Sequence, residues 1–419
     1  MATEKKIASV PVVNDVNVEL QAKKLQLHWL LQITKAINYN FSTKQLFDVY
    51  EHVLRSQLKV EKLALLIHDG SWRCSLLYGT DKNFNDIDLT RIIGELNKLH
   101  KLELEQELWI NTFDTILPVY HKDHLIAYAL VGGLANSVIP KRNELVPFIH
   151  TITNLIVVAI ENNTIANEKI RQAGIRKELE LAAEMQSMLF PINLPRQNEY
   201  EVHATYLPHQ EVGGDYYDFI QVNKNEFIFC LADVSGKGIP AALLMSNFQA
   251  NLHALLPHTN SLTELVSLLN AKVFQSAKGE KFITFFIGRY HALTRELHYV
   301  NAGHNPPFLI HEKVVYMLND GSTGLGMFET LPFINSGKVF IPPNAMLHCY
   351  TDGVTDVIND EGEEYGMDRL RNFLTSRNQL HDMEALHSQL ISTLSSYRQS
   401  KNYTDDITLF SVWFKNLST

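Results

Sequence analysis

Apolar positions in the first 160 residues follow helical spacing at both ends and strand-like spacing in between. Residues 25–37 and 41–60 place apolar side chains every three or four positions, which predicts two helices. A helical pattern at 87–106 interrupts four short runs with the composition of strands, at 62–68, 72–77, 117–120 and 125–132. A long helix begins near Asn143. This order predicts an α+β domain over residues 25–160.

Residues 161–190 predict a further helix, because they are polar, lack proline and contain good helix formers. Pro191 ends it, since proline disfavours helical geometry in the residue before it. Apolar side chains recur at about 3.5-residue spacing, interrupted by Gln186, in a row made of Ile175, Leu179, Ala182 and Leu189. The segment is either a solvated connector or a signalling helix that pairs with a second copy. Its place between two domains favours the second interpretation.

From residue 191 onward the pattern changes to many short strands with helical segments between them. The expected strands are 200–207, 227–234, 281–290, 297–301, 307–310, 314–317, 339–341, 345–350 and 407–414. The expected helices are 240–256, 262–276, 367–375 and 383–397. This pattern predicts a second α+β domain over 191–419, with two antiparallel sheets and helices on their outer faces.

Composition narrows the class of partner and compartment. The 419 residues carry a formal charge of −9, from 46 acidic and 37 basic residues, which argues against nucleic acid as the main partner. Residues 1–24 read as a loose lead-in without the apolar segment of a signal peptide, and the runs 125–131 and 155–160 are too short to span a bilayer. We therefore expect a soluble, cytoplasmic protein with no membrane partner. The cysteines are widely spaced, which predicts free thiols rather than a disulfide or zinc site at Cys74, Cys230 and Cys349.

Four acidic motifs in the C-terminal half carry the candidate chemistry. They are GGDYYD at 213–218, DVSGKG at 233–238, TDG at 351–353 and TDDIT at 404–408. Three of them adjoin strand-like runs, so distant parts of the chain would bring carboxylates together at strand ends. Oxygen ligands of this kind suit Mg²⁺ or Mn²⁺. Since a metal-activated water is the simplest route to hydrolysing a phosphoester, the motifs indicate that chemistry.

Five segments, in this order, are similar to the PPM family of metal-dependent serine/threonine phosphatases, and within it to the bacterial SpoIIE/RsbU-like branch. They are GGDYYDF, ADVSGKGIPAALLMS, NAGHNPP, YTDGVTD and YTDDITL. The similarity covers residues 190–416 and implies an α-β-β-α sandwich, two Mn²⁺ or Mg²⁺ ions and phosphoprotein substrates. The helix that ends in ELAAEMQSMLFP resembles the regulatory helix of that branch.

The order of elements in residues 25–160 resembles a GAF-type sensory domain, including a central strand at 125–132. That resemblance implies sensing of a small molecule or protein signal, and often dimerisation. A packing domain that binds no ligand stays an equal alternative.

The expected metal ligands come from all four motifs. Asp215 follows two glycines, which let the backbone turn tightly and bring its carboxylate to the metals. The resemblance adds Asp233 and the carbonyl of Val234, and it favours Asp405 over its neighbour. Asp352 follows a strand, and the glycine after it permits a close approach. These four aspartates are the expected catalytic residues.

Several nearby residues have two readings each. Asp218 is either a further metal ligand or a structural carboxylate. Asp406 is expected to support the ligand Asp405 rather than to bind metal itself. His304, in the NAGHNPP segment, would contact the phosphate or the leaving oxygen, but a hydrogen-bonded turn is the simpler reading. Lys237 would contact phosphate or, more simply, be a solvated loop residue. No arginine adjoins the motifs, so the metals would hold most of the substrate phosphate.

The expected function is hydrolysis of phosphoserine or phosphothreonine by a metal-activated water. The resemblance implies a phosphorylated STAS-type anti-anti-sigma regulator as substrate and partner. The N-terminal domain and linker helix are expected to form a homodimer that regulates the metal site. The alternative is an inactive phosphatase-fold scaffold, against which the four intact motifs argue. A cyclic-dinucleotide synthase, which GGDYYD alone would allow, does not account for the other motifs.

Overall fold

The computed structural model describes residues 12–81, 113–139, 141–377 and 382–416, with the side chains from Leu20 onward. Its contacts divide the chain into two compact units, Met1–Ala173 and Gly174–Thr419. This division splits the expected linker 161–190, and the four-part organisation predicted from the sequence stays a prediction.

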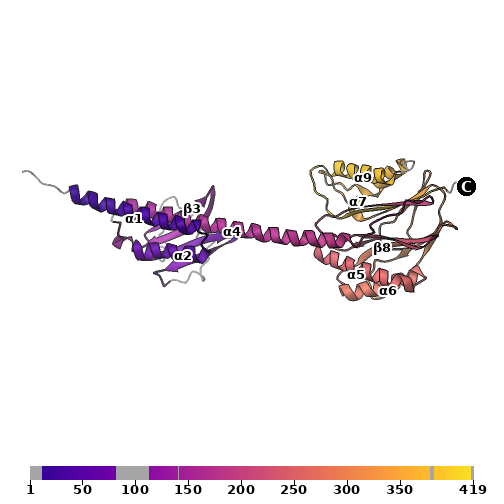
Figure 1. Cartoon of the computed structure of the whole chain (residues 1–419), viewed down its shortest axis with the longest axis horizontal. Helices are drawn as coiled ribbons and strands as arrows, with labels where there is room; N and C mark the ends of the chain where they lie inside the picture. Colours follow the sequence, from indigo (N-terminus) through magenta and orange to yellow (C-terminus); the bar gives the residue numbers. More distant parts are fainter. Residues whose placement is uncertain (1–11, 82–112, 140, 378–381, 417–419) are drawn as a thin grey trace, which may run out of the picture. The chain divides into compact units, whose positions relative to one another are not determined.

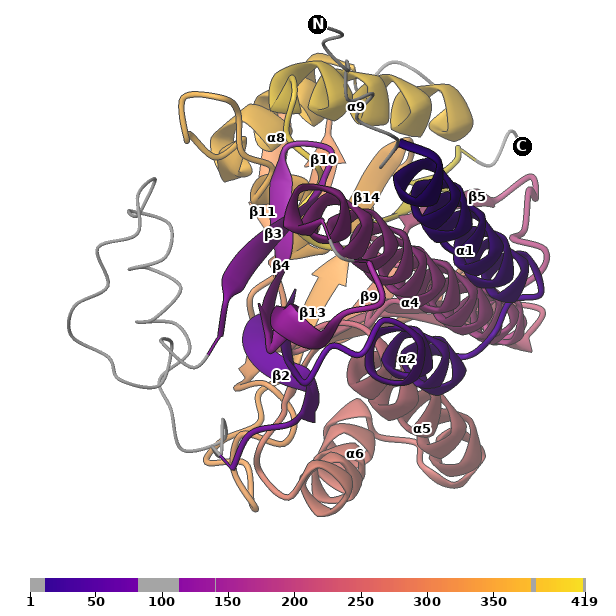
Figure 2. The same cartoon turned by 90° about the vertical axis from the view of Figure 1, so that its left-hand side faces the viewer.

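The N-terminal unit is a four-stranded antiparallel sheet with helices on one face. Its elements are α1 (Val12–Asn38), α2 (Thr43–Glu51), a π-helical turn (His52–Gln57), β1 (Lys62–Asp69), β2 (Ser71–Tyr78), β3 (Thr115–His121), β4 (His124–Gly132), a 3₁₀ turn (Leu134–Asn136) and the start of α4 (Arg142–Ser187). The strand order is β2-β1-β4-β3. Figure 2 shows α1, α2 and α4 together on one side of this sheet, and their apolar side chains form one core with it.

The four expected strands of this unit are present, and the helix expected at 87–106 lies outside the described residues. The lead-in 1–24 differs from expectation, because α1 already begins at Val12. The α+β architecture expected for this unit is present, and its assignment as a GAF-type domain stays a prediction.

Helix α4 is a single 46-residue helix, so the helix expected near Asn143 and the expected linker helix are continuous. By length and composition α4 could cross a membrane, although neither apolar run of the sequence could do so alone. Half of the residues in its most apolar window are buried inside the protein, as in a core helix.

The C-terminal unit contains two sheets between two layers of helices. One sheet has the order β11-β10-β14-β15-β5 and the other β12-β9-β8-β7-β6, with β13 beside β9. Its strands are β5 (Tyr200–Leu207), β6 (Tyr216–Asn223), β7 (Glu226–Val234), β8 (Ile283–His291), β9 (Glu296–Ala302), β10 (Phe308–His311), β11 (Val314–Met317), β12 (Gly321–Ser322), β13 (Gly337–Phe340), β14 (Ala345–Tyr350) and β15 (Ile407–Phe414). Its helices are α5 (Ile239–Leu255), α6 (Leu262–Ala277), α7 (Asp352–Thr355), α8 (Gly366–Ser376) and α9 (Met383–Arg398), with a 3₁₀ turn at Leu256–His258.

Figure 1 shows α5 and α6 on one outer face of this sandwich and α9 on the other. The apolar core between the sheets is rich in aromatic residues, and separate apolar clusters lie under each helical layer. The predicted arrangement of two sheets with outer helices is therefore confirmed. The sequence did not predict β6, β12 or α7; β6 and α7 begin inside polar motifs, and β12 is only two residues long.

All three cysteines are free thiols, as predicted, with Cys230 and Cys349 buried and Cys74 half-exposed.

Candidate active site

Asp215 lies just before β6 and is almost fully buried, with 1% of its surface exposed. Two hydroxyl groups donate to its Oδ2 atom: Thr351 Oγ1 at 2.9 Å and Thr408 Oγ1 at 2.5 Å. Both threonines belong to the opposite sheet or the loop that leaves it, so Asp215 is tied across the sandwich. One carboxylate oxygen thus stays oriented by the protein.

The two glycines before Asp215 allow a close approach of chain segments. A Cβ atom at Gly213 would lie 2.0 Å from the Tyr206 hydroxyl and 2.4 Å from the Asp406 carboxylate. Asp406 in turn accepts hydrogen bonds from the backbone amides of His209 and Gly214, each at 2.7 Å. Asp406 therefore holds the glycine turn in place, which gives this carboxylate a structural task behind its neighbour, as expected.

Asp233 and Val234 end the buried strand β7, and the Val234 carbonyl faces the backbone of Gly214. Asp233 and Asp215 lie within hydrogen-bonding reach of each other. Asp352 is the first residue of the short helix α7. The glycine after it is required, since a Cβ atom at Gly353 would lie 1.9 Å from the Asp406 carbonyl oxygen.

Asp405 faces a lysine. The Lys237 ammonium lies 2.8 Å from its carboxylate and also donates to the Thr404 carbonyl. The other Asp405 oxygen accepts the Asp406 amide at 2.9 Å. Lys237 is an exposed loop residue, as in the simpler interpretation, and it is also paired with a predicted site residue.

The electrostatics show that these carboxylates repel one another. Burial and the neighbouring Asp233 raise the pKa of Asp215 well above its ordinary value. Burial, and then Asp352 and Asp405, raise the pKa of Asp233 to about 7. Burial, Asp356 and Asp405 raise the pKa of Asp352 to about 6. A pocket that holds several carboxylates in low dielectric is unfavourable unless cations or protons neutralise it.

The donor set fits a hard divalent cation, because the facing side chains offer only oxygen atoms and their mutual repulsion would be relieved by positive charge. Among the described residues, no three acidic, histidine or cysteine side chains lie close enough in this arrangement to hold one ion. The Lys237 ammonium supplies one positive charge at the edge of this group, through its ion pair with Asp405.

Asp218 is not among the carboxylates that raise the pKa values of Asp215, Asp233 and Asp352. Its own contacts are those of a structural carboxylate. Its Oδ2 accepts the Tyr216 hydroxyl at 2.5 Å and lies 2.6 Å from His253 Nε2, while its Oδ1 accepts the Phe219 amide at 2.7 Å. His253 belongs to α5, so Asp218 attaches this helix to β6.

His304 lies between the two sheets near the carboxylates. Its backbone amide donates to Asn301 Oδ1, and its Nδ1 lies 2.8 Å from the hydroxyl of Thr284, which is paired with Asp233 across β7 and β8. The ring also lies against the carbonyl of Tyr350, two residues before Asp352. Burial lowers the His304 pKa to about 4, so the ring is neutral. His304 is therefore placed to fix the spacing between two parts of the acidic cluster.

The end of α4 contacts the glycine turn directly. The Gln186 side chain is buried and makes two hydrogen bonds to Gly213: its Nε2 donates to the carbonyl at 2.7 Å, and its Oε1 accepts the amide at 3.1 Å. Three residues after the helix, Phe190 packs against the rings of Tyr206, Tyr216 and Tyr217. The last turn of α4 is thus bound to the segment that carries Asp215.

Sequence reasoning missed Thr351, Thr408 and Gln186. The two threonines stand inside the TDG and TDDIT motifs, so their position was a usable signal. Gln186 was seen only as an interruption of an apolar row, which is the mark of a polar residue with a partner elsewhere.

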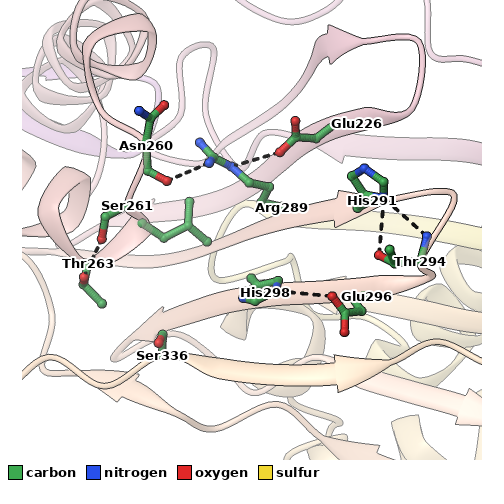
Figure 3. Close-up of a pocket in the computed structure, with 11 residues that line it drawn as sticks. Glu226, Asn260, Ser261, Thr263, Arg289, His291, Thr294, Glu296, His298 and Ser336 are labelled. Carbon is green, nitrogen blue, oxygen red and sulfur yellow. Dashed lines mark hydrogen bonds and ion pairs between the residues drawn. The ribbon is translucent and has the colours of Figure 1, made fainter.

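A separate polar cavity of about 420 Å³ lies at the other end of the β6–β9 sheet (Figure 3). Arg289 and His291 line it from the end of β8, far along the strand from Thr284. Its rim contains the pairs Arg289–Glu226 and His298–Glu296. None of the predicted site residues lines this cavity, so it is distinct from the acidic cluster.

Comparison with known proteins places the C-terminal unit. Residues 223–415 match the family described as "Stage II sporulation protein E (SpoIIE)", a span that includes Asp233, Asp352 and Asp405 and begins after Asp215. Phosphoserine phosphatase RsbU of Bacillus subtilis is 30% identical over 193 residues, covering 46% of this chain and 57% of that protein.

Protein IcfG of Synechocystis is 26% identical over 314 residues, covering 68% of this chain and 46% of that protein. That share is more than Gly174–Thr419 could supply, so the match extends into the N-terminal unit. The chain spans about half the length of these curated relatives.

Among solved structures, the SiaA-PP2C domain of Pseudomonas aeruginosa is similar with a TM-score of 0.51 and 18% identity, over 58% of this chain and 99% of that one. This similarity shows the fold. The C-terminal unit therefore has the PP2C fold, and its residues 223–415 are similar to the SpoIIE family and to RsbU.

Proposed function

We propose that the C-terminal unit is a metal-dependent protein phosphatase that hydrolyses phosphoserine or phosphothreonine. The observation that carries the proposal is the group of buried and half-buried carboxylates from four distant motifs, several of which repel one another, at one end of a PP2C-type sandwich. Similarity to a protein named a phosphoserine phosphatase supports the reaction.

Asp215, Asp233, Asp352 and Asp405, with the Val234 carbonyl, would hold two Mn²⁺ or Mg²⁺ ions. Bound divalent cations supply the positive charge that activates water and stabilises the phosphoryl oxygens during hydrolysis. The chain's own residues orient this set: Thr351 and Thr408 hold the Asp215 carboxylate, and Asp406 holds the preceding turn. Lys237, whose ammonium lies 2.8 Å from the Asp405 carboxylate, would be within reach of a substrate phosphate held at this group.

The proposed substrate is a phosphorylated regulatory protein of the STAS type. The similarity to RsbU and the resemblance of the motifs to the SpoIIE/RsbU-like branch support this choice. The proposed compartment is the cytoplasm, where such a regulator would be found.

Regulation is proposed to act through α4. This helix begins in the core of the N-terminal unit and ends at Gln186, whose two hydrogen bonds reach the turn before Asp215. A rotation or shift of its last turn would move Gly213 and therefore the Asp215 carboxylate. Replacing Gln186 with alanine should change the metal concentration needed for half-maximal activity, whereas Glu184→Ala, an exposed change in the same turn, should not. Equal metal requirements in both variants would contradict this route.

A homodimer through α1 and α4 is the proposed assembly. Both helices expose large apolar side chains: Leu20, Leu27 and Leu31 on α1, and Ile165, Ile170, Ile175, Leu181 and Met185 on α4. Exposed apolar rows of this kind are stabilised by pairing with another helix. Sedimentation of the full chain tests the assembly, and a monomer at micromolar concentration would rule it out.

The reaction is tested with a phosphoserine protein substrate and Mn²⁺ or Mg²⁺. Phosphate release that requires the metal and is lost in Asp352→Asn supports the proposal. Turnover without added metal, or equal turnover in the variant, would refute it. Complete inactivity of the wild-type chain with retained binding of a phosphoprotein would instead favour the alternative, an inactive scaffold.

A further inference from the structure

The N-terminal unit contains a cleft of about 450 Å³ between α2, α4 and the β1–β2 hairpin. This volume is in the range of small-molecule sites in proteins. The lining residues come from five elements, namely α2, β1, β2, β4 and α4.

The floor of the cleft is apolar. Ile126, Val157 and Ile160 are buried members of the domain core, and Phe47 and Ile67 pack against the same core while staying half-exposed. An apolar group placed here would continue the core and remove these two side chains from water, which is favourable in proportion to the area covered.

The rim of the cleft is polar, and its charges already have partners. Arg73 lies 2.5 Å from Asp69, and Glu161 lies 2.8 Å from the ring of His121. A charged ligand would have to displace one of these pairs or be placed beside a group that is already neutralised. Three hydroxyl groups complete the rim, from Thr43, Ser75 and Thr164. The Thr164 hydroxyl already donates to the Ile160 carbonyl at 3.0 Å and can accept from a ligand, whereas a hydroxyl such as that of Thr43 or Ser75 can donate or accept.

We propose that this cleft binds a small, uncharged, mostly apolar molecule that carries one or two hydroxyl or carbonyl groups. Its apolar body would cover Phe47 and Ile67, and its polar groups would face the hydroxyls of the rim. Four lining residues belong to α4, the helix that ends at Gln186, so a bound molecule would contact the proposed regulatory helix. This last consequence rests on the proposed function, whereas binding itself does not.

Binding is tested on the full chain with N-phenyl-1-naphthylamine, an uncharged apolar dye whose emission rises in apolar surroundings. We expect saturable binding at one site per chain. Thr164→Trp and Thr43→Trp place a large ring over the floor from two different helices. Each should weaken binding by at least about tenfold, equivalent to about 1.4 kcal/mol. Asn162→Trp is the matched control, because this exposed α4 residue does not line the cleft, and it should bind like the wild type.

Absence of saturable binding, or equal binding in the wild type and both cleft variants, would overturn the proposal. The anionic dye 1-anilinonaphthalene-8-sulfonate separates the ligand classes: if it competes for the same site and binds more tightly, the uncharged class is wrong. A separate measurement of phosphate release at saturating neutral dye tests the regulatory consequence. An unchanged rate would show that the cleft does not influence the active site, and the binding result would still stand. If the full chain had no phosphatase activity at all, the proposed function would fail while the dye titration would still decide whether the cleft binds a ligand.

Discussion

Two groups of buried titratable side chains lie in the C-terminal unit, and they solve the problem of burial in opposite ways. At one end of the sandwich, the buried Asp215 and the half-buried Asp233 lie close together, and Asp352 lies near Asp233; burial, together with repulsion from neighbouring carboxylates, raises the pKa of each. Under α9, His348 and His387 are buried, and burial lowers their pKa values, so both stay neutral. The first group needs cations or protons to neutralise it, whereas the second carries no charge.

In the histidine group, neutral side chains share hydrogen bonds with two hydroxyl groups. The Ser411 hydroxyl lies 2.8 Å from both His348 Nδ1 and His387 Nε2, and the Thr205 hydroxyl lies 2.9 Å from His387 Nδ1. His203, beside Ser411 on β5, packs its ring against His387. This network attaches α9 to its sheet, while the buried Nε2 of His348 has no hydrogen-bond partner within the described part of the chain. The comparison teaches that burial of ionisable groups marks a binding site only when their charges are unmatched.

The largest effect is expected from Asp352→Asn, because it removes one charge from the unmatched group. Phosphatase activity should fall more than about a hundredfold, since several kcal/mol of metal-dependent stabilisation is lost. The metal-free protein should instead become more stable, because the repulsion with Asp405 is removed. Phosphate release and thermal unfolding in a chelator measure the two effects.

Asp368→Asn, which changes an exposed carboxylate on α8, is the control and should alter neither phosphate release nor thermal stability. A variant that is less stable than the wild type without metal would contradict this reading.

Next in size is the response to acid. The His348 pKa is about 4 when folded and about 6.5 when unfolded, so the unfolded chain binds more protons between these values. Stability from this group is therefore complete above pH 6.5 and falls as the pH drops towards 4, by about 3 kcal/mol. The buried aspartates have the opposite sign, because their raised pKa values favour the folded state as pH falls. Denaturant unfolding in excess Mg²⁺ should isolate the histidine slope, and His348→Asn should reduce it without abolishing it, because His304 and His387 also have lowered pKa values. A slope unchanged in the variant would assign the acid response elsewhere.

A smaller effect is expected at His304. This histidine is buried and neutral like His348, but it contacts Thr284, which is paired with Asp233 of the acidic group. His304→Ala should weaken metal binding about 10- to 100-fold, as is typical when a residue behind the ligands is removed. His304→Asn, which keeps a polar group towards Thr284, should recover part of this loss. Calorimetric titration with Mn²⁺ measures it. Since His348→Ala should lower stability to a similar extent without changing metal affinity, equal affinities in the two alanine variants would make His304 merely structural.

The sequence predicted regular elements well where local pattern decides them, and long-range contacts explain what it missed. Strand β5 has its predicted bounds because alternating residues face either the core or α9. Strand β6 was missed because it contains Asp218, whose charge is accommodated only by Tyr216 on the same strand and His253 on α5. The four motif aspartates could be identified from spacing and resemblance.

The oxygen atoms that hold Asp215 could not be found in that way, because they depend on side chains 136 and 193 residues away in the sequence. The partner of Gln186 was equally hidden. A helix pattern shows that a polar residue breaks an apolar row, but not that the fold brings a backbone amide and carbonyl to meet it.

The smallest effect is expected at His253, which tests whether Asp218 belongs to either group. Asp218 is buried like the site aspartates, but it has a hydroxyl, a backbone amide and an imidazole as partners. His253→Asn should lower stability by at most about 1 kcal/mol, because the histidine is half-exposed and the other two partners remain. Metal affinity and turnover should stay at wild-type values, measured by the same titration and phosphate-release assays. If Asp218 is only structural, the variant weakens the attachment of α5 to β6 and nothing else. Loss of metal affinity in the variant would instead show that Asp218 belongs with the carboxylates that need a cation.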